Sequence, residues 1–469
     1  MKKTLSFILV MLLVFGLFAC SSSESAPAST QAVTTAPQET EGTTGLMAGF
    51  GRVDISPTAP IGMGGYGDKD TRLSGAILDN IYATCVALKL GEDTFLVFTV
   101  DVIAAGDTVA NTLRGSVSEA TGVPQEHILV GATHTHSAPE WNGGTSSGCV
   151  AAAKIAMEDM APASLEMASA ELDNMNFVRH YLMNDGTYYG SNFGSDESGF
   201  KAHALEVDNQ ISLLKLERGD KKGILMINWQ AHPAAAARQV DYTGVSADFV
   251  GYTRKKIELE TGLQVAYYTG ASGNVNPRSL IETENTNNNT NFQSYGATLG
   301  EKVIALLPTL TPVEVNGTSA AYSHFPVEVD HSWDHMAVQA SEVVGAWKNQ
   351  SLEAGHELAR EYGLSSAYHA NSILNRSALK GQQYRDLYAF RLGPIGFINN
   401  TYETFCDHGA YVKEQSPFDM TFVITGCSGY IANEASYGYR SYESDTCPYV
   451  IGTGEALAEE MARLLNTLK

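Results

Sequence analysis

The chain has 469 residues, which is enough for one large domain or two medium ones. A hydrophobic fraction of 44% with 17% charged residues is typical of a globular protein with a sizeable core. Acidic residues outnumber basic ones 52 to 30, the formal net charge is −22, and Lys and Arg form no visible cluster. Phosphate backbones are bound by such clusters, so the composition argues against a nucleic-acid partner.

The first twenty residues are expected to be an export signal. Lys2 and Lys3 form a basic start, residues 5–18 are almost wholly apolar, and Leu17-Phe-Ala-Cys20 closes the segment. This segment resembles a bacterial lipoprotein signal, whose cysteine becomes the lipidated first residue of the mature chain. It is too short for an ordinary spanning helix. We therefore expect an exported protein, anchored through lipidated Cys20 at the outer face of a bacterial cell membrane. A plain secretory signal or an uncleaved anchor is the alternative.

Residues 21–46 are rich in Ser, Thr, Ala and Glu and show no hydrophobic pattern. This composition predicts a disordered tether that holds the folded part off the membrane. Folded sequence is expected from Met47, and no second linker or internal repeat follows. Residues 47–469 are therefore predicted to form one domain.

Five cysteines follow Cys20, an odd number without a CxxC pair. This pattern argues against both a disulfide framework and a thiolate zinc site. One or two disulfides remain open in an oxidising compartment. The favoured candidates among the five are the last three, Cys406, Cys427 and Cys447.

Strand and helix patterns alternate in the first third of the folded part. Residues 94–103 read as a strand, and Asp107 is expected to cap a helix that runs to about residue 120. Gly122 and Pro124 end this helix, and a second apolar strand follows at residues 128–130.

The same order returns later, with a strand at 223–229, a helix at 248–260 followed by Gly262, and a strand at 264–268. Strand–helix–strand units of this length imply parallel pairing. The sequence therefore predicts an α/β fold, a layered mixed sheet with flanking helices.

The remaining segments are predicted more coarsely. Residues 175–208 are expected to be irregular, 295–306 and most of 336–380 helical, and 388–399 a hairpin that turns at Gly393-Pro394. A final helix over 454–468 carries an apolar stripe that is expected to face the core. The stripe consists of Leu457, Met461, Leu464, Leu465 and Leu468.

Two histidines directly follow the strand at 128–130. In an extended chain, side chains two apart point the same way, so His134 and His136 are expected to share a face. In α/β folds, ligands gather beyond the C-terminal ends of strands, and His232 and the glycine-rich loop 270–277 occupy equivalent ends. Histidine is the commonest zinc ligand, so this pattern predicts a metal site at these strand ends. Polar histidines satisfied within a loop are the alternative.

Gly144-Thr-Ser-Ser-Gly148 matches the GxSxG pattern of a serine nucleophile. That pattern requires a strand before it and a helix after it, and no strand is predicted here. A flexible loop is the preferred interpretation, and a serine hydrolase that uses Ser146 is kept as an alternative function.

Four sequence blocks together resemble the neutral, non-lysosomal ceramidases. Gly131-Ala-Thr-His-Thr-His-Ser-Ala-Pro139 is similar to the segment that marks this family, and Arg52-Val-Asp-Ile-Ser-Pro57 resembles its opening. Asn228 to Pro233 with Ser246 to Phe249 resembles the second histidine block, and Gly270 to Pro277 resembles the next loop. The likeness spans the family's catalytic domain, from about Met47 to the C-terminus.

The resemblance implies one zinc ion per chain, held by two histidines, a glutamate and a tyrosine. By position these are His134, His232, Glu403 and Tyr442. Glu403 stands where the family usually has Pro-Gly-Glu, and Tyr442 begins a Tyr-Glu pair after a Gly-Tyr-Ile block. Whether a second, structural metal is bound is left open.

The resemblance also implies hydrolysis of an amide bond at zinc. His136 is expected to face the substrate, where it would bind it or shuttle a proton. Arg179 resembles a family arginine that contacts substrate, and Tyr449 is a candidate for support of the oxyanion.

Two departures bear on the substrate. Asn276 stands where the family has a serine in its glycine loop. The family also has a β-sandwich after its last helix, whereas this sequence stops at that helix. The expected substrate is therefore ceramide or a related N-acylated lipid or small molecule. A non-catalytic solute-binding lipoprotein is the rival interpretation.

Overall fold

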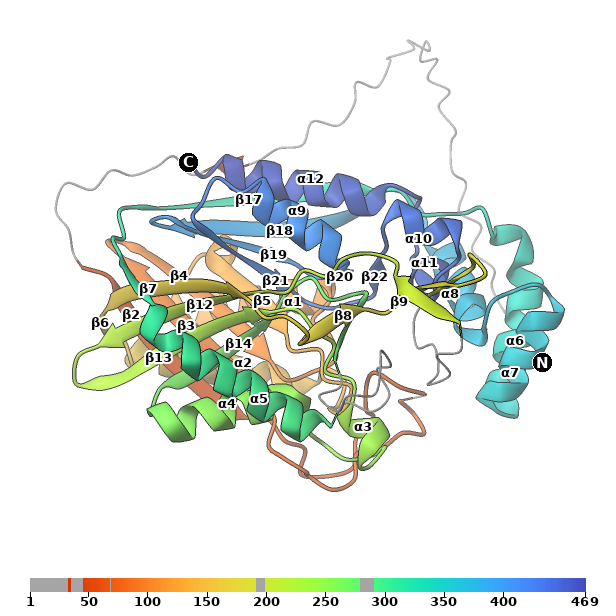
Figure 1. The fold of residues 1–469 in the computed structure, drawn as a ribbon, viewed down its shortest axis with the longest axis horizontal. Helices are drawn as coiled ribbons and strands as arrows, with labels where there is room; N and C mark the ends of the chain where they lie inside the picture. The colour runs from red at the N-terminus through yellow and green to blue at the C-terminus, as the bar shows by residue number, and fades with distance from the viewer. Residues whose placement is uncertain (1–32, 35–44, 68, 191–198, 279–290) are drawn as a thin grey trace, which may run out of the picture.

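Three five-stranded mixed sheets form the frame of the protein, seen in a computed structural model that describes residues 33–34, 45–67, 69–190, 199–278 and 291–469 (Figure 1). The first sheet has the order β5 (Ile128–Ala132), β4 (Asp93–Val100), β3 (Tyr82–Leu90), β2 (Met47–Asp54), β6 (Ala161–Pro162). The second has the order β14 (Gln264–Thr269), β13 (Lys221–Trp229), β12 (Gln210–Arg218), β7 (Ser164–Glu171), β16 (Thr311–Val313). The third has the order β1 (Val33–Thr34), β17 (Thr318–Val327), β18 (Gln383–Leu392), β19 (Ile395–Asn400), β21 (Met420–Thr425).

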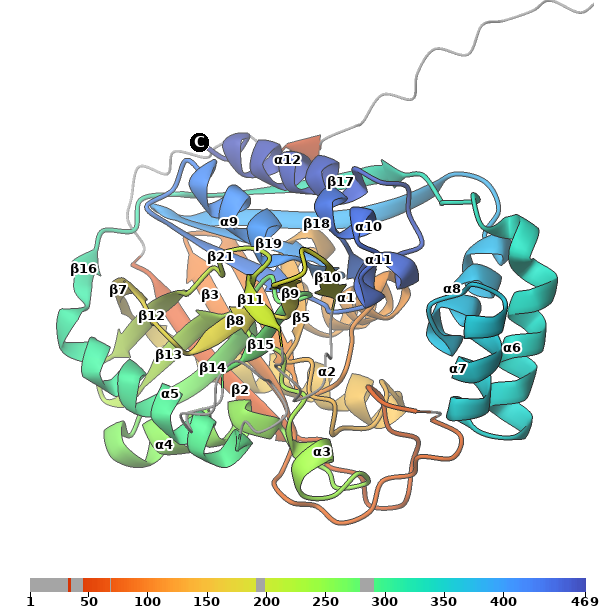
Figure 2. The same ribbon diagram turned by 45° about the vertical axis from the view of Figure 1, so that its right-hand side comes forward.

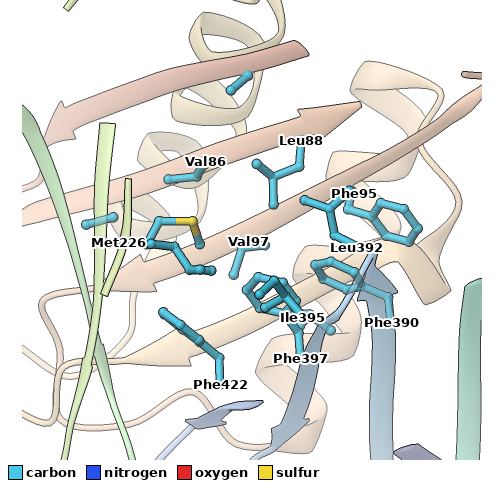
Figure 3. Packing of buried hydrophobic residues seen from close by; sticks show 14 of the residues in the cluster. Val86, Leu88, Phe95, Val97, Met226, Phe390, Leu392, Ile395, Phe397 and Phe422 are labelled. Carbon is cyan, nitrogen blue, oxygen red and sulfur yellow. The ribbon is translucent and has the colours of Figure 1, made fainter. Parts of the chain in front are cut away.

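The three sheets share one central hydrophobic core, to which strands of every sheet contribute (Figure 3). Side chains alternate along each strand, so the opposite faces can pack against helices. Along β3, for example, Val86 and Leu88 belong to the central core, whereas Cys85 and Ala87 pack with the helices outside. The strands are therefore apolar on both faces and buried between layers.

A pair of helices covers the outer face of each sheet (Figures 1 and 2). The first sheet is covered by α1 (Asp107–Thr121) and α2 (Gly143–Glu158), and the second by α4 (Asp248–Thr261) and α5 (Phe292–Leu306). The third is covered by α9 (Cys406–Glu414) and α12 (Thr453–Asn466). The predicted layered α/β fold is confirmed.

Three further helices stand beside the sheets and pack on one another (Figure 2). They are α6 (Ala337–Asn349), α7 (Leu352–Glu361) and α8 (Ala367–Ala378), which enclose a small hydrophobic core of their own. We call them the helical unit. Within the described residues, none of the helices is both long and apolar enough to cross a membrane.

Short elements complete the chain. They are α3 (Ala236–Gln239), α10 (Glu434–Gly438), α11 (Tyr442–Thr446), β8 (Asn176–Val178), β9 (His180–Met183), β10 (Tyr188–Gly190), β11 (Phe200–His203), β15 (Val275–Pro277), β20 (Glu403–Thr404) and β22 (Tyr430–Ile431).

Each sheet contains one parallel pair of strands, namely β4 with β5, β13 with β14, and β19 with β21. Buried asparagine amides join these pairs across the sheet boundaries. The amide of Asn399 exchanges hydrogen bonds of 3.1 Å with the backbone of Val130, and that of Asn228 exchanges bonds of 3.0 and 3.1 Å with the backbone of Val423. Buried polar groups need such partners, so these bonds fix the strand ends relative to one another.

Most of the predicted elements lie where the sequence placed them. Both strand–helix–strand units have parallel strands, and the hairpin over 388–399 is the antiparallel pair β18 and β19. The leucine-rich stripe of the last helix is buried against the third sheet, as expected.

Four local expectations were wrong or incomplete. Asp107 does not cap α1, because Gly106 is the cap and Asp107 is the first helical residue. Residues 144–148 form the start of α2 and not a loop, since Asn142 accepts hydrogen bonds from Gly144 N and Thr145 N and so caps the helix. The stretch 175–208, expected to be irregular, contains the short strands β8 to β11. Within the predicted tether, Val33–Thr34 pair with β17, and the signal segment and the rest of the tether up to residue 44 lie outside the described residues.

The five cysteines that follow Cys20 are free thiols, and all are buried. The candidate disulfides among Cys406, Cys427 and Cys447 are therefore absent from the described part of the chain. Burial raises the pKa of each of the three thiols.

Candidate metal centre

The site begins with the loop that follows β5. The strand ends at Ala132, so the alternation expected of an extended chain does not continue to the histidines. His134 instead has a φ of +68°, in the left-handed region that costs most non-glycine residues free energy. His136 is tied to a second chain segment by its backbone N–H, which donates to Pro233 O at 3.0 Å. The two imidazoles still face each other, with their Nε2 atoms 3.3 Å apart.

The other two sheets each deliver one residue to the same place. His232 follows β13 by three positions, is fully buried, and donates its backbone N–H to Val275 O at 3.0 Å. Glu403 follows β19 by three positions, is 7% exposed, and donates its backbone N–H to Gly429 O at 2.9 Å. The carboxyl ends of the three parallel strand pairs therefore converge on one point, as ligand sites in α/β folds do.

Four side chains bring their ligand atoms together there. His134 Nε2 lies 2.9 Å from His232 Nε2, and Glu403 Oε2 lies 3.1 and 3.3 Å from these two nitrogens. The ligand nitrogens of His134, His136 and His232 all lie within 4.8 Å of one another. His136 is therefore near enough to belong to the same cluster.

In His134 and His232, a hydrogen bond at Nδ1 fixes the tautomer of the ring. His134 Nδ1 lies 2.6 Å from Ile103 O, and His232 Nδ1 lies 2.9 Å from Ser272 O. A carbonyl oxygen only accepts hydrogen bonds, so each Nδ1 carries a proton and each neutral ring presents a bare lone pair at Nε2. Backbone carbonyls orient metal-binding histidines in this way in many proteins.

The electrostatics of the cluster favour the unprotonated ligand forms. Burial, reinforced by the charges of Arg179 and His134, lowers the pKa of His232 to about 4. Burial alone would raise the pKa of Glu403, but His134 and His232 outweigh it and hold that pKa far below its usual range. Glu403 Oε2 is buried and accepts no hydrogen bond from the described residues. At neutral pH His232 therefore offers an unprotonated nitrogen and Glu403 an ionised carboxylate.

Facing acceptors repel unless a cation lies between them, and this arrangement fits a divalent metal. Two imidazole nitrogens and a carboxylate oxygen form a typical donor set for zinc. Donor atoms ~2.0–2.1 Å from one tetrahedral ion are about 3.3 Å apart, close to the spacings between His134, His232 and Glu403.

The cluster lies in the wall of a cavity of about 850 Å³. Tyr442, the fourth predicted ligand, begins α11, is half-buried and lines this cavity, and its ring meets that of Tyr430 edge to face with centroids 5.7 Å apart. Burial raises the pKa of the Tyr442 phenol. The structure thus brings Tyr442 into the same cavity as the histidines and Glu403.

Arg179 also lines the cavity, but most of its guanidinium is engaged. Its Nε donates to Glu443 Oε1 at 2.8 Å, and its NH2 group donates to Gly273 O at 2.8 Å and to the Tyr430 hydroxyl at 3.0 Å. One NH1 hydrogen bond goes to Asn276 Oδ1 at 3.3 Å, so among the described residues one N–H of the guanidinium has no acceptor.

Glu443 was not predicted as part of the site. It is fully buried and also contacts His180, with 2.9 Å between Glu443 Oε2 and His180 Nε2. Glu443 and His180 each lie next to a predicted site residue in the sequence, since Glu443 follows Tyr442 and His180 follows Arg179. That adjacency is the signal that could have pointed to this buried network.

Two other predicted residues do not reach the cavity. Tyr449 is buried and pairs its hydroxyl with Arg385 and, at 3.1 Å, with the Tyr402 hydroxyl. Ser146 lies in the first turn of α2 and accepts a hydrogen bond of 2.9 Å from the Trp141 indole. The sharp strand-to-helix turn of a serine nucleophile is therefore missing at Ser146.

Comparisons with known proteins place the fold. No protein-family model and no curated protein matches the chain. A solved structure of neutral ceramidase from Pseudomonas aeruginosa is similar, with a TM-score of 0.65 and 15% identity over 90% of this chain and 74% of that one. A ceramidase complexed with C2 is similar with a TM-score of 0.66 and 16% identity over 90% of this chain and 75% of that one. The chain thus has the neutral ceramidase fold, as the sequence blocks predicted.

Proposed function

We propose that the protein is a zinc-dependent hydrolase that cleaves an N-acyl amide bond. The observation that carries the proposal is the convergence of two tautomer-fixed histidines and a buried carboxylate, 2.9–3.3 Å apart, in the wall of a cavity. That cluster lies in a neutral ceramidase fold.

Zinc would be held by His134, His232, Glu403 and Tyr442. Bound zinc supplies a Lewis acid, which lowers the pKa of water from 15.7 to about 7 and polarises a carbonyl oxygen. Backbone carbonyls keep the Nδ1 protons of both histidines in place, so their lone pairs stay directed at the ion.

His136 and Arg179 are proposed to act on the substrate. His136 lines the cavity and is 9% exposed, which places its ring next to a bound molecule with which it would exchange a proton; its Nδ1 is buried and has no hydrogen-bond partner among the described residues. The remaining NH1 hydrogen of Arg179 would bind a carbonyl oxygen of the substrate. The pairing of Arg179 with Glu443 holds the guanidinium in one orientation.

The substrate is proposed to be ceramide or a related N-acylated lipid or small molecule. Support comes from the similar ceramidase complexed with C2 and from the cavity of about 850 Å³, which is large enough for a ligand of that kind. Export and anchoring through lipidated Cys20 complete the proposal. Labelling of cells with an alkyne fatty acid tests the anchor, because Cys20→Ala should abolish the label.

The decisive test is to measure zinc and amide hydrolysis in the same preparation. We expect one zinc per chain by mass spectrometry, release of fatty acid from N-acyl substrates, loss of that activity with a chelator, and its return with added zinc. A protein that lacks stoichiometric metal and binds N-acyl compounds without cleaving them would instead be a solute-binding lipoprotein.

A further inference from the structure

The helical unit forms one wall of the cavity that contains the histidine cluster. Residues of all three helices line it, from Trp347 on α6 and His356 on α7 to Asn375 on α8. The unit has a separate hydrophobic core and stands beside the three sheets (Figure 2). The sheets thus provide the ligand cluster, while the helical unit provides the surface that a bound molecule meets across the cavity.

One face of α8 presents polar side chains to the cavity. Tyr368, Asn371, Ser372 and Asn375 are spaced i, i+3, i+4, i+7, which places them on one side of a helix. Ser372 donates to Thr446 O at 2.9 Å. The side-chain amides of Asn371 and Asn375, in contrast, make no hydrogen bond within the described part of the chain. Each amide offers two donor hydrogens and an acceptor oxygen.

Aromatic rings connect this wall to the ligand cluster. Trp347 and Tyr368 meet edge to face with centroids 5.2 Å apart, and Tyr368 meets Tyr442 in the same way at 5.8 Å. Tyr442 in turn contacts Tyr430, whose hydroxyl accepts from Arg179. These rings therefore line the cavity between the ligand cluster and the face of α8 that carries Asn371 and Asn375.

Amides beside aromatic rings suit a ring or chain that bears several hydroxyl groups. Hydroxyls donate to and accept from an amide, and aromatic rings cover the apolar C–H faces between the hydroxyls. An aliphatic chain on this wall would bury the amides without partners, which costs free energy. Among the described residues of this wall the cation is Arg376 on α8, and it already donates to Asp330 and to Cys447 O, both at 3.3 Å, so a neutral group suits the wall better than an anionic one.

We infer that the helical unit binds a neutral, polyhydroxylated part of the substrate, as in an N-acylated amino sugar. Asn371 and Asn375 hydrogen-bond its hydroxyls, and Trp347 and Tyr368 pack on its C–H faces. The inference rests on the proposed function only in placing the N-acyl bond at the histidine cluster.

The test compares two ligands that share an acyl chain and a six-membered ring. N-octanoylglucosamine carries hydroxyl groups on its ring, and N-octanoylcyclohexylamine carries none. Binding of each is measured by titration calorimetry, and hydrolysis is measured in parallel. Wild type should bind the glucosamine compound at least about 10-fold more tightly, the effect of a few hydrogen bonds to a ligand.

The double variant Asn371→Ala/Asn375→Ala should remove this preference and leave binding of the cyclohexylamine compound unchanged. Asn349→Ala is the matched control, because Asn349 is exposed at the end of α6 and does not line the cavity. A folded double variant that retains the preference, or a wild type that has none, would overturn the inference. If the double variant unfolds, the single variants Asn371→Ser and Asn375→Ser decide in the same assay.

Binding and hydrolysis separate this inference from the proposed function. A selective loss of glucosamine binding without hydrolysis of either compound would support the polar wall and contradict the hydrolase. Hydrolysis of both compounds at equal rates, unaffected by the double variant, would support the hydrolase and contradict the polar wall.

Discussion

The Nε2 atoms of His134 and His232 lie 2.9 Å apart, and neither carries a proton when the rings are neutral, because both Nδ1 atoms donate to backbone carbonyls. Each histidine arrives from a different sheet, so packing of the whole core sets this distance. Such facing lone pairs repel each other, and a divalent metal between them would replace the repulsion with two metal–nitrogen bonds.

Replacing either of these histidines should abolish metal binding. We expect His134→Ala and His232→Ala to lose the zinc measured by mass spectrometry. Hydrolysis should fall about 1,000-fold, since a metal supplies several kcal/mol of transition-state stabilisation. His335→Ala, which removes an exposed histidine, should change neither quantity. Full zinc content in His134→Ala would show that the ligands lie elsewhere.

His136 should behave differently from its neighbour. If it faces the substrate, His136→Ala keeps one zinc per chain while kcat falls by about 100- to 10,000-fold, the usual contribution of a general acid or base. Its Nε2 nevertheless lies 3.3 Å from that of His134. Loss of zinc from His136→Ala would therefore make it a third nitrogen ligand and refute the division of roles.

The sequence predicted those features of the fold that depend on local residue patterns. Apolar runs and glycine stops located most strands and helices, such as β13 and α4 with Gly262 at its end. The α/β pattern placed His134 and His232 at equivalent strand ends, whereas Glu403 was expected only from the family resemblance, because its approach depends on three sheets that meet through long-range packing. The backbone carbonyls that hold the two histidines have no side-chain signature in the sequence.

Other parts of the site were missed for a related reason. Glu443 is an ordinary acidic residue in the sequence, and only the fold surrounds it with Arg179 and His180. The sequence pattern predicted that the segment of α8 is helical. No local sequence pattern indicated that Asn371 and Asn375 face a cavity.

The cysteines should resist alkylation in the native protein. Cys85, Cys149, Cys406, Cys427 and Cys447 are all free and buried. Burial raises the pKa of Cys406 to about 12, so at pH 8 almost none of it is the reactive thiolate. Iodoacetamide followed by peptide mapping should therefore label none of the five before denaturation and all of them after it. A pair that stays unlabelled after denaturation without reductant would reveal a disulfide.

Removing the charge of Glu443 should destabilise the protein strongly. Burial alone would raise the pKa of Glu443, but the charges of Arg179 and His180 outweigh it and lower the pKa to about 2. Glu443→Gln leaves the buried Arg179 guanidinium without its counterion, which costs about 3 kcal/mol of unfolding free energy. Chemical denaturation at pH 7 measures this loss.

The matched control is Glu353→Gln, which removes one partner of an exposed pair with Arg360 and should cost less than about 1 kcal/mol. The effect at Glu443 should also depend on pH with a defined sign. A carboxyl whose pKa is lowered by folding stabilises the protein above its unfolded pKa, and this stabilisation disappears as the pH falls. The difference between wild type and Glu443→Gln should therefore be largest above pH 4.5 and shrink toward pH 2. A difference that is constant from pH 7 to pH 3 would mean that Glu443 acts through packing and not through its charge.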